Sequence, residues 1–376
     1  MIILHCAERK KWEEESKSGL YGTHYITDLG FIPCMKAENI IPDNFSFSSM
    51  KDYLILCIDT DKVNAEIKTE IVSPNEYATT NIYGTISTNA VSTFLEYKFD
   101  SNDVLLMSRE IEDIKIINEI LEKLNIGYET HMYFCDGTST RIILLNNKYV
   151  VRQNNPNLLE SEVMFLKSST TTKLQKVLYA DKDYRYAVYN FIPGEVMHMI
   201  EDFDGVIKNI KEIISDYKPY KGEGFGYTYE TYDTWGDFLK SIVHSNSLTL
   251  PESFDYLSKV YDAIAELDKY SFEKKLIHGD FGTHNFIELD GKFVGAIDPA
   301  PIAGDPLYDV LYALMSNVDF LPKVTIDFVS KTFSEPAEKV KALLIVVLFC
   351  RFAICLKYHK EDMDAYVDYW FNLIEQ

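Results

Sequence analysis

Residues 276–309 read LIHGDFGTHNFIELDGKFVGAIDPAPIAGDPLYD, and three of their polar side chains stand out against an apolar background. Asp280 follows a His-Gly pair, Asn285 comes five residues later, and Asp298 ends an apolar run. Apolar residues alternate on either side of an Asp-Gly pair, which predicts a β-hairpin with a tight turn. The hairpin should bring its outer ends together, so Asn285 and Asp298 are expected to lie side by side, with Asp280 on the loop that leads in.

These three side chains have the chemistry that phosphoryl transfer requires. Amide and carboxylate oxygens are hard ligands of the kind that Mg²⁺ takes, and Mg²⁺ shares its coordination shell with substrate phosphates. Phosphoryl transfer needs metal ions that bridge the phosphate oxygens and a base that orients the acceptor hydroxyl. The alternative is an ordinary hairpin with polar ends, because Asp and Asn are common turn formers.

The order His-Gly-Asp, four residues, Asn, then Ile-Asp, resembles the catalytic and metal-binding motifs of the aminoglycoside phosphotransferase family. These proteins are small-molecule kinases with a protein-kinase-like fold. The resemblance implies that Asp280 is the catalytic base that accepts the proton of the acceptor hydroxyl. It implies that Asn285 and Asp298 are the ligands of Mg²⁺, and that His278 has a structural role in holding the catalytic loop.

A Gly-Asp-Pro-x-x-Asp element follows and also matches the family. Asp305 before Pro306 is a favourable N-cap and N1 pair, and predicts a helix over 307–317. Asp309 is expected to tie this helix back to the catalytic loop. The sequence departs from the family pattern at Pro299, where many relatives have an aromatic residue, so the local backbone is left open.

Upstream residues fit the nucleotide-binding half of a kinase-like fold. Two strands flank a small-residue turn at Gly137, Thr138 and Ser139, whose N–H groups would face the ATP phosphates. A simple hairpin turn is the alternative for this segment. The resemblance places Arg152 where the family has its phosphate-pairing cation, with Lys148 as the alternative.

A helix predicted over 158–168 carries the glutamate that best matches the partner of this cation, Glu162, whereas Glu160 would point to another face. A solvated glutamate on an amphipathic helix is the alternative for Glu162. The segment 186–195 then resembles the hinge between the two lobes. Adenine would bond there to main-chain groups of residues near the hinge, namely Asn190, Phe191 and Ile192.

Residues 1–104 have a different pattern, with short strands predicted over 2–6, 53–58 and 91–97 and a polar helix over 8–18. The unit resembles a small bacterial family of unknown function that is related in fold to ADP-ribosyltransferases. The segments that carry the resemblance are Ile3-Leu4-His5, Gly30–Cys34, Leu54–Asp59 and Ile82–Gly84.

Two of the histidines of that family are replaced here, by Pro33 and Asn81, and only His5 remains. The replacements argue against an ADP-ribosyl-transferring or NAD-binding activity in this part. A buried structural histidine is the favoured interpretation of His5.

The composition sets limits on the function. A chain of 376 residues exceeds one ordinary hydrophobic core, and 47% apolar with 25% charged residues is typical of a soluble globular protein. The net charge of −21 argues against nucleic acid or an anionic membrane as partner and suits a cationic small molecule. Six scattered cysteines without a CxxC pair, and no signal sequence, predict a cytoplasmic protein.

The C-terminal part is predicted to be helical. Thr234 is a candidate N-cap, and Pro336 should interrupt the helical region 326–369. The apolar run 342–356 includes Arg351 and is too short to span a bilayer, so it predicts a buried core helix. Acidic residues near the C-terminus, among them Asp364 and Asp368, would help to bind a cationic acceptor or simply form a solvated helix face.

Together these patterns predict an α+β protein with a small N-terminal α+β domain (1–104) and a bilobal protein-kinase-like domain. The latter has a β-rich N-lobe (105–192) and a helical C-lobe (193–376). The expected activity is Mg²⁺-dependent transfer of the γ-phosphate of ATP or GTP to a small-molecule hydroxyl, with an aminoglycoside as the first candidate acceptor. The alternative is a nucleotide-binding pseudo-kinase that regulates or serves the N-terminal domain. The oligomeric state is not predicted.

Overall fold

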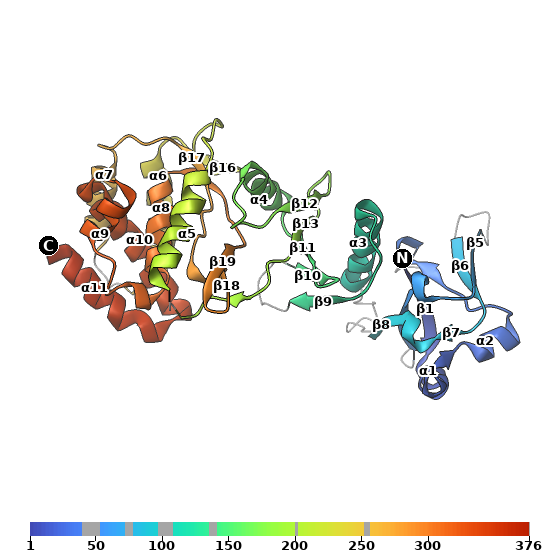
Figure 1. Cartoon of the computed structure of the whole chain (residues 1–376). Helices are drawn as coiled ribbons and strands as arrows, with labels where there is room; N and C mark the ends of the chain where they lie inside the picture. The colour runs from blue at the N-terminus through green and yellow to red at the C-terminus, as the bar shows by residue number, and fades with distance from the viewer. Residues whose placement is uncertain are drawn as a thin grey trace. The chain divides into compact units, whose positions relative to one another are not determined.

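The computed structural model describes residues 1–39, 53–71, 78–96, 108–134, 141–199, 202–251 and 256–375 (Figure 1). The chain divides into two compact units. The first unit comprises Met1–Tyr133 and Ile143–Asn147, and the second unit comprises Phe134–Ile142 and Lys148–Gln376. The domain boundary that the sequence predicts near residue 104 lies outside the described residues, and the predicted domain limits remain a prediction.

A four-stranded antiparallel sheet in the order β3-β1-β4-β8 is the centre of the first unit. The predicted strands over 2–6, 53–58 and 91–97 are β1, β4 and β8, and the predicted polar helix is α1 followed by a short 3-10 turn. The elements of this part are β1 (Ile2–Glu8), α1 (Arg9–Glu15), β2 (Leu20–Tyr21), α2 (Thr23–Asp28), β3 (Met35–Lys36), β4 (Tyr53–Asp59), β5 (Glu66–Ile71), β6 (Ala78–Tyr83), β7 (Ile86–Ser87), β8 (Val91–Glu96), α3 (Ser108–Leu124), β9 (His131–Phe134) and β10 (Arg141–Leu145).

Among the described residues of the first unit, His5 is a histidine that is almost fully buried. Its Nδ1 lies 2.6 Å from the carbonyl oxygen of Pro33, and its Nε2 lies 3.0 Å from the hydroxyl of Tyr21. Because a carbonyl oxygen only accepts, Nδ1 carries the proton and Nε2 accepts from the tyrosine. Burial lowers the pKa of His5 to about 4, so the ring is neutral. His5 therefore has the structural role that the sequence favours.

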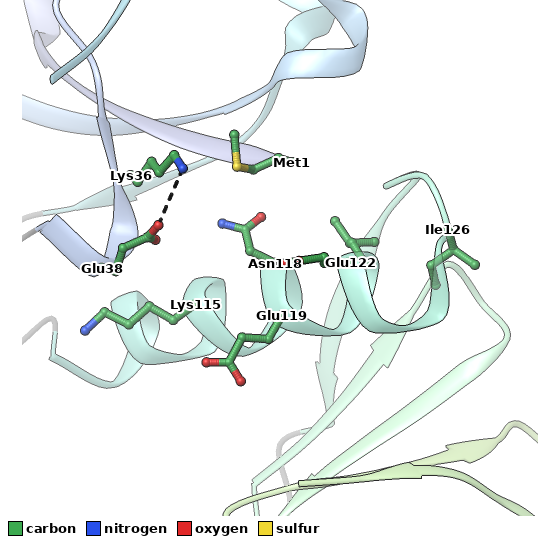
Figure 2. Close-up of a pocket in the computed structure, with 9 residues that line it drawn as sticks. Met1, Lys36, Glu38, Lys115, Asn118, Glu119, Glu122 and Ile126 are labelled. Atoms are coloured by element: carbon green, nitrogen blue, oxygen red, sulfur yellow. Dashed lines mark ion pairs between the residues drawn. The ribbon is translucent and has the colours of Figure 1, made fainter. Parts of the chain in front are cut away.

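The helix α3, which the sequence places at the start of the N-lobe, belongs to the first unit by its contacts. The side-chain amide of Asn118 bonds both main-chain groups of Ile2: Oδ1 accepts from the N–H at 2.7 Å and Nδ2 donates to the carbonyl at 2.9 Å. Figure 2 shows the cavity of about 600 Å³ beside these contacts, where Lys36 and Glu38 face Lys115 and Glu119 of α3.

The second unit begins with three antiparallel strands in the order β12-β13-β11 and the helix α4, and continues into a mainly helical part. Its elements are β11 (Tyr149–Gln153), α4 (Pro156–Ser168), β12 (Val177–Ala180), β13 (Ala187–Asn190), β14 (Glu195–Val196), α5 (Phe203–Asp216), β15 (Phe225–Tyr227), β16 (Glu230–Tyr232), α6 (Trp235–Ser247), α7 (Leu257–Leu267), β17 (Lys275–Ile277), β18 (Phe286–Leu289), β19 (Lys292–Ala296), β20 (Ile302–Gly304), α8 (Pro306–Met315), α9 (Ile326–Phe333), α10 (Ala337–Tyr358) and α11 (Met363–Glu375).

The helix α10 is the centre of the helical part, and α6, α7, α8, α9 and α11 pack against it (Figure 1). Its residues are buried on all sides because the sequence 342–356 is almost entirely apolar, so the predicted core helix is confirmed. Arg351 lies within this buried stretch. In the described part of the chain, no helix combines the length and the apolar character needed to cross a bilayer.

The predicted helix boundaries hold where capping chemistry defines them. Thr234 Oγ1 accepts from the N–H of Asp237 at 3.0 Å at the start of α6, and Asp305 Oδ1 accepts from the N–H of Leu307 at 3.0 Å at the start of α8. Each side chain satisfies an N–H group that has no partner within its own helix. The break predicted at Pro336 separates α9 from α10.

Candidate active site

The strands β18 and β19 form the predicted hairpin and bring the ends of the motif together. Asp290 and Gly291 at its turn have φ angles of 53° and 70°, both left-handed, which is the conformation that a two-residue hairpin turn requires. At the open end, the N–H of Ile297 donates to the carbonyl of Asn285 at 2.9 Å. Asn285 and the residue before Asp298 are therefore hydrogen-bonded neighbours, as the sequence predicts.

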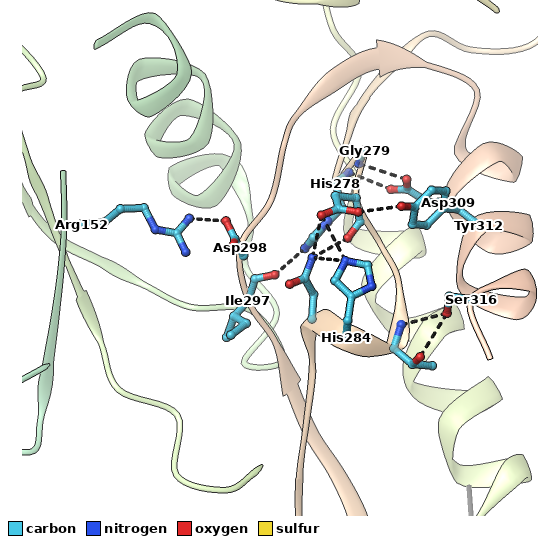
Figure 3. Close-up of polar contacts among 12 residues, drawn as sticks. Arg152, His278, Gly279, His284, Ile297, Asp298, Asp309, Tyr312 and Ser316 are labelled. Atoms are coloured by element: carbon cyan, nitrogen blue, oxygen red, sulfur yellow. Dashed lines mark hydrogen bonds and ion pairs between the residues drawn. The ribbon is translucent and has the colours of Figure 1, made fainter. Parts of the chain in front are cut away.

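Asp309 of α8 holds the loop that precedes the hairpin (Figure 3). Its carboxylate is fully buried and accepts from the N–H of His278 at 2.7 Å, the N–H of Gly279 at 3.0 Å and the hydroxyl of Tyr217 at 2.7 Å. Burial raises the pKa of Asp309 to about 7, while these three donors lower it in part. The predicted tie between α8 and the loop is thus present.

The loop also needs a glycine at position 279. Gly279 has a left-handed φ of 80°, and a Cβ atom there would lie 2.0 Å from the carbonyl oxygen of Ala300. The neighbouring His278 donates from Nε2 to the carbonyl of Ile297 at 3.0 Å and is fully buried. Burial lowers the pKa of His278 to about 4, so a neutral ring links the loop to the hairpin.

Three donors hold the carboxylate of Asp280 in place. Oδ1 accepts from the hydroxyl of Tyr312 at 2.9 Å, and Oδ2 accepts from Nδ2 of Asn285 at 3.0 Å and from Nε2 of His284 at 3.2 Å. Burial alone would raise the pKa of Asp280, but the hydrogen bonds from His284 and Tyr312 outweigh it and lower the pKa to about 2. About a third of the side chain is exposed (36%), so the carboxylate is both ionised and accessible.

The two predicted metal ligands fit an oxygen-coordinated cation. Nδ2 of Asn285 donates to both the carbonyl and Oδ2 of Asp280, which fixes the amide and leaves Oδ1 as the end available to a metal. Asp298 is half exposed (51%) and has a left-handed φ of 57° before Pro299, a strained conformation of a kind found at functional sites. Their oxygens are the ligand type that Mg²⁺ prefers.

No set of three His, Cys, Asp or Glu side chains among the described residues is arranged to hold a metal. A cation between Asn285 and Asp298 would therefore depend on phosphate oxygens and water to complete its shell. Such sharing is the usual mode of Mg²⁺ binding at phosphoryl-transfer sites.

Arg152 of β11 bridges two carboxylates. Its Nη1 lies 3.0 Å from Oε1 of Glu162 on α4 and 2.5 Å from Oδ1 of Asp298. Arg152 and Glu162 are almost fully buried, with 5% and 3% of their side chains exposed, whereas Lys148 and Glu160 are exposed. Burial would lower the pKa of Arg152, but the two carboxylates raise it, so the guanidinium stays charged. The structure thus pairs Arg152, rather than Lys148, with Glu162, rather than with Glu160.

The hinge segment has some of its main-chain groups already engaged. The carbonyl of Asn190 accepts from Nε2 of Gln175 at 3.2 Å, and its N–H donates to the carbonyl of Lys176 at 3.1 Å. The N–H of Phe191 donates to the carbonyl of Lys148 at 2.8 Å. The N–H groups of Asn190 and Phe191 are thus engaged, whereas a carbonyl oxygen can accept a second hydrogen bond. The adenine contacts at Asn190, Phe191 and Ile192 remain a prediction. The predicted phosphate-binding turn at 137–139 lies outside the described residues.

Several residues of the site are absent from the motif. Tyr312 and Tyr217 donate to Asp280 and Asp309, and Ser316 accepts from the N–H of Thr283 at 2.9 Å. Tyr312 lies three residues after Asp309 on α8, so helical spacing placed it on the same face and could have indicated it. Nothing in the sequence around Tyr217 indicated its contact.

Solved structures of aminoglycoside phosphotransferases resemble this chain. Aminoglycoside phosphotransferase APH(4)-Ia is 16% identical with a TM-score of 0.50, over 70% of this chain and 98% of that chain. A thermostable mutant of it, in ternary complex with AMP-PNP and hygromycin B, is 17% identical with a TM-score of 0.50, over 69% of this chain and 97% of that chain. A further mutant, with ADP and hygromycin B, gives the same identity, coverage and score. The likeness confirms the protein-kinase-like fold.

Residues 6–94 match the family described as "Protein of unknown function (DUF952)". This match confirms that the N-terminal segment resembles a family of unknown function, as the sequence predicts. Comparison with curated proteins gave no significant match.

Proposed function

We propose that this chain transfers the γ-phosphate of ATP or GTP to a hydroxyl group of a small molecule. The observation that carries the proposal is the bridge from Glu162 through Arg152 to Asp298. In kinase-like phosphoryl transfer, a strand cation paired with a helix glutamate orients the phosphates next to the carboxylate that holds the metal. The bridge supplies this pairing, and the hydrogen bond between Asn285 and Asp280 joins the metal site to the acceptor site.

In the proposed reaction, the acceptor oxygen bonds to the γ-phosphorus while the bond from phosphorus to the β–γ bridging oxygen breaks. A nucleoside diphosphate leaves, and the hydroxyl proton passes to the carboxylate of Asp280. A carboxylate with a pKa of about 2 is a weak base at neutral pH, so its main contribution is to orient the hydroxyl. This suits a loose transition state in which the proton is lost late.

The proposal includes the nucleotide and metal contacts that the family resemblance implies. Mg²⁺ held by Asn285 and Asp298 would neutralise the phosphates, and Arg152 would orient them. By the same resemblance, the turn at 137–139 would cover the phosphates, and main-chain groups at Asn190, Phe191 and Ile192 would bind adenine.

An aminoglycoside is the first candidate acceptor. The net charge of −21 favours a cationic ligand, and solved structures of similar fold contain hygromycin B. The alternative, a pseudo-kinase that binds nucleotide without turnover, predicts nucleotide affinity without nucleotide consumption.

The test is a coupled assay of nucleotide consumption by the full chain with Mg²⁺, across a panel of hydroxyl acceptors that includes aminoglycosides. The matched control is the Asp280→Asn variant, which keeps the size of the side chain and removes its charge. Acceptor-dependent consumption that the variant lacks would support the proposal. Tight nucleotide binding without consumption for any acceptor would favour the pseudo-kinase.

A further inference from the structure

A cavity of about 390 Å³ lies in the second unit, next to the catalytic loop. Thr283 and His284 of that loop line one side, and Ser316 at the end of α8 and Arg351 of α10 line another. Two acidic residues, Asp319 and Asp362, also border it. None of the functions assigned to the candidate active site involves a ligand in this cavity.

Hydrogen bonds connect the cavity to the catalytic carboxylate. Nε2 of His284 lies 3.2 Å from Oδ2 of Asp280, and the N–H of the adjacent Thr283 donates to Oγ of Ser316 at 2.9 Å. The carbonyl of Ser316 accepts from Nη2 of Arg351 at 3.0 Å. Figure 3 shows His284 and Ser316 below His278 and Gly279 of the catalytic loop. A molecule in the cavity would therefore contact the loop that carries Asp280.

Arg351 is the unusual group of this cavity. It is 8% exposed, yet among the described residues it forms no ion pair with a carboxylate, and its Nε has no hydrogen-bond partner. The bond to Ser316 and the Tyr366 ring at 5.3 Å account for part of the guanidinium, and a cation suits the C-terminal end of α8. These contacts leave Nε without a partner, and neither Asp319 nor Asp362 at the rim of the cavity forms an ion pair with the guanidinium. A buried charge is costly unless it is paired.

We propose that this cavity binds a negatively charged oxygen group of the phosphate acceptor, a carboxylate or a phosphate, with Arg351 as its counterion. The proposal rests on the proposed function, and it changes the expected acceptor from a cationic molecule to one that carries an anionic group besides its hydroxyl. Asp319 is exposed and Asp362 partly so, and their repulsion of the anion is weakened by water. Arg351 acts from the buried side, where its field is least screened.

The direct test measures anion binding by the full chain without nucleotide. Inorganic phosphate and acetate are titrated separately, and binding is followed by the NMR signal of the Arg351 Nε–H group and by thermal stabilisation. Saturable binding of one of them that shifts the Nε–H signal is expected, and the responding anion identifies the group. An unchanged Nε–H signal with both anions would overturn the proposal, because any stabilisation would then come from an adventitious ion only.

Three variants locate the site. Arg351→Gln should abolish the anion-dependent stabilisation, and Asp362→Asn should tighten binding about twofold to fivefold because it removes a repelling carboxylate. Lys357→Gln, which removes an exposed cation from the same helix, should leave binding unchanged. If Arg351→Gln does not fold, Asp362→Asn decides, since a gain in affinity cannot come from misfolding. Unchanged affinity in Asp362→Asn would contradict the assignment.

Measurements of turnover with different acceptors distinguish a failure of the cavity assignment from a failure of the proposed function. Acceptors of similar size are compared: a hydroxy acid, a neutral polyol and an amino alcohol. The hydroxy acid, or its phosphate-bearing counterpart, should give the highest kcat/KM. If no acceptor is phosphorylated but phosphate still binds through Arg351, the proposed function fails and the cavity assignment stands. If only the amino alcohol reacts, equally well in Arg351→Gln, the cavity assignment is overturned and the kinase function stands.

Discussion

Replacing Glu162 with glutamine separates the role of the buried ion pair in stability from its role in phosphate binding. Glutamine has the size of glutamate and can still accept a hydrogen bond from Nη1 of Arg152, while Arg152 keeps its contact with Asp298. The variant therefore leaves no unpaired buried cation. Glu160→Gln on the exposed face of the same helix is the matched control.

The pKa of Glu162 sets the size of the effect on stability. Burial raises this pKa from 4.5 to about 7, against the opposing effect of the Arg152 cation. Because the folded chain holds the proton more tightly than the unfolded chain, stability is full below the unfolded pKa and is lost as pH rises through the folded pKa. At about 1.4 kcal/mol for each pKa unit, the wild type should lose about 3 kcal/mol between pH 4.5 and pH 7 or above.

We therefore expect Glu162→Gln to lose less than about 1 kcal/mol of unfolding free energy near pH 5, because it replaces a neutral carboxyl by a neutral amide. Near pH 8 the variant should equal or exceed the wild type, by up to about 3 kcal/mol. Its affinity for AMP-PNP with Mg²⁺ should fall about tenfold or more. A neutral glutamine holds Arg152 less strongly than an ionised glutamate does, so Arg152 shifts towards Asp298 and loses a charge-assisted phosphate contact of about 1.5–3 kcal/mol.

Denaturant unfolding near both pH values and calorimetric titration of nucleotide are the measurements. A loss of more than about 3 kcal/mol near pH 8 would refute the reasoning, because it would show that the ionised pair stabilises the fold. Unchanged nucleotide affinity would remove Arg152 from the phosphate site. Glu160→Gln should change neither quantity.

Four further outcomes are expected. Asp280→Ala should abolish turnover and leave nucleotide affinity, measured by calorimetry, within about threefold, because the side chain faces the acceptor. Asp298→Asn should weaken both Mg²⁺-dependent nucleotide binding and rate; an unchanged Mg²⁺ titration would place the metal elsewhere. Tyr312→Phe removes one donor from Asp280, so the carboxyl pKa measured by NMR should rise by about one unit, with a smaller loss of kcat than in Asp280→Ala. The fragment 103–376 should still bind nucleotide, whereas its helix α3 should exchange amide hydrogens faster than in the full chain; lost nucleotide binding would contradict the predicted domain boundary.

The sequence predicts those parts of the site whose structure is determined by residues close together in the chain. The hairpin follows from alternation around Asp290-Gly291, and the start of α8 follows from Asp305-Pro306, because turn and capping preferences act within a few residues. The link from Asp309 to the loop was inferred from the family motif. Burial of α10 follows from an apolar run too long for one amphipathic face.

Contacts between distant segments could not be predicted from local chemistry. Asp216 at the end of α5 accepts from Ser169, Thr170 and Thr171 beyond the end of α4, and these residues are about 45 positions away in the chain. The bonds of Asn118 to Ile2 span 116 positions. Ser, Thr and Asn side chains have many possible partners, and only the fold selects one.

The carboxylates of the motif show why position alone does not assign a role. Asp280 and Asp309 both belong to the resemblance, and both contact the catalytic loop. Asp280 is partly exposed, and hydrogen bonds lower its pKa to about 2, whereas Asp309 is fully buried and its pKa is raised to about 7. Both carboxylates accept three hydrogen bonds, but only the accessible carboxylate of Asp280 can contact an acceptor hydroxyl. The two surroundings therefore support the proposed role of Asp280 in the reaction, whereas the hydrogen bonds of Asp309 hold the loop.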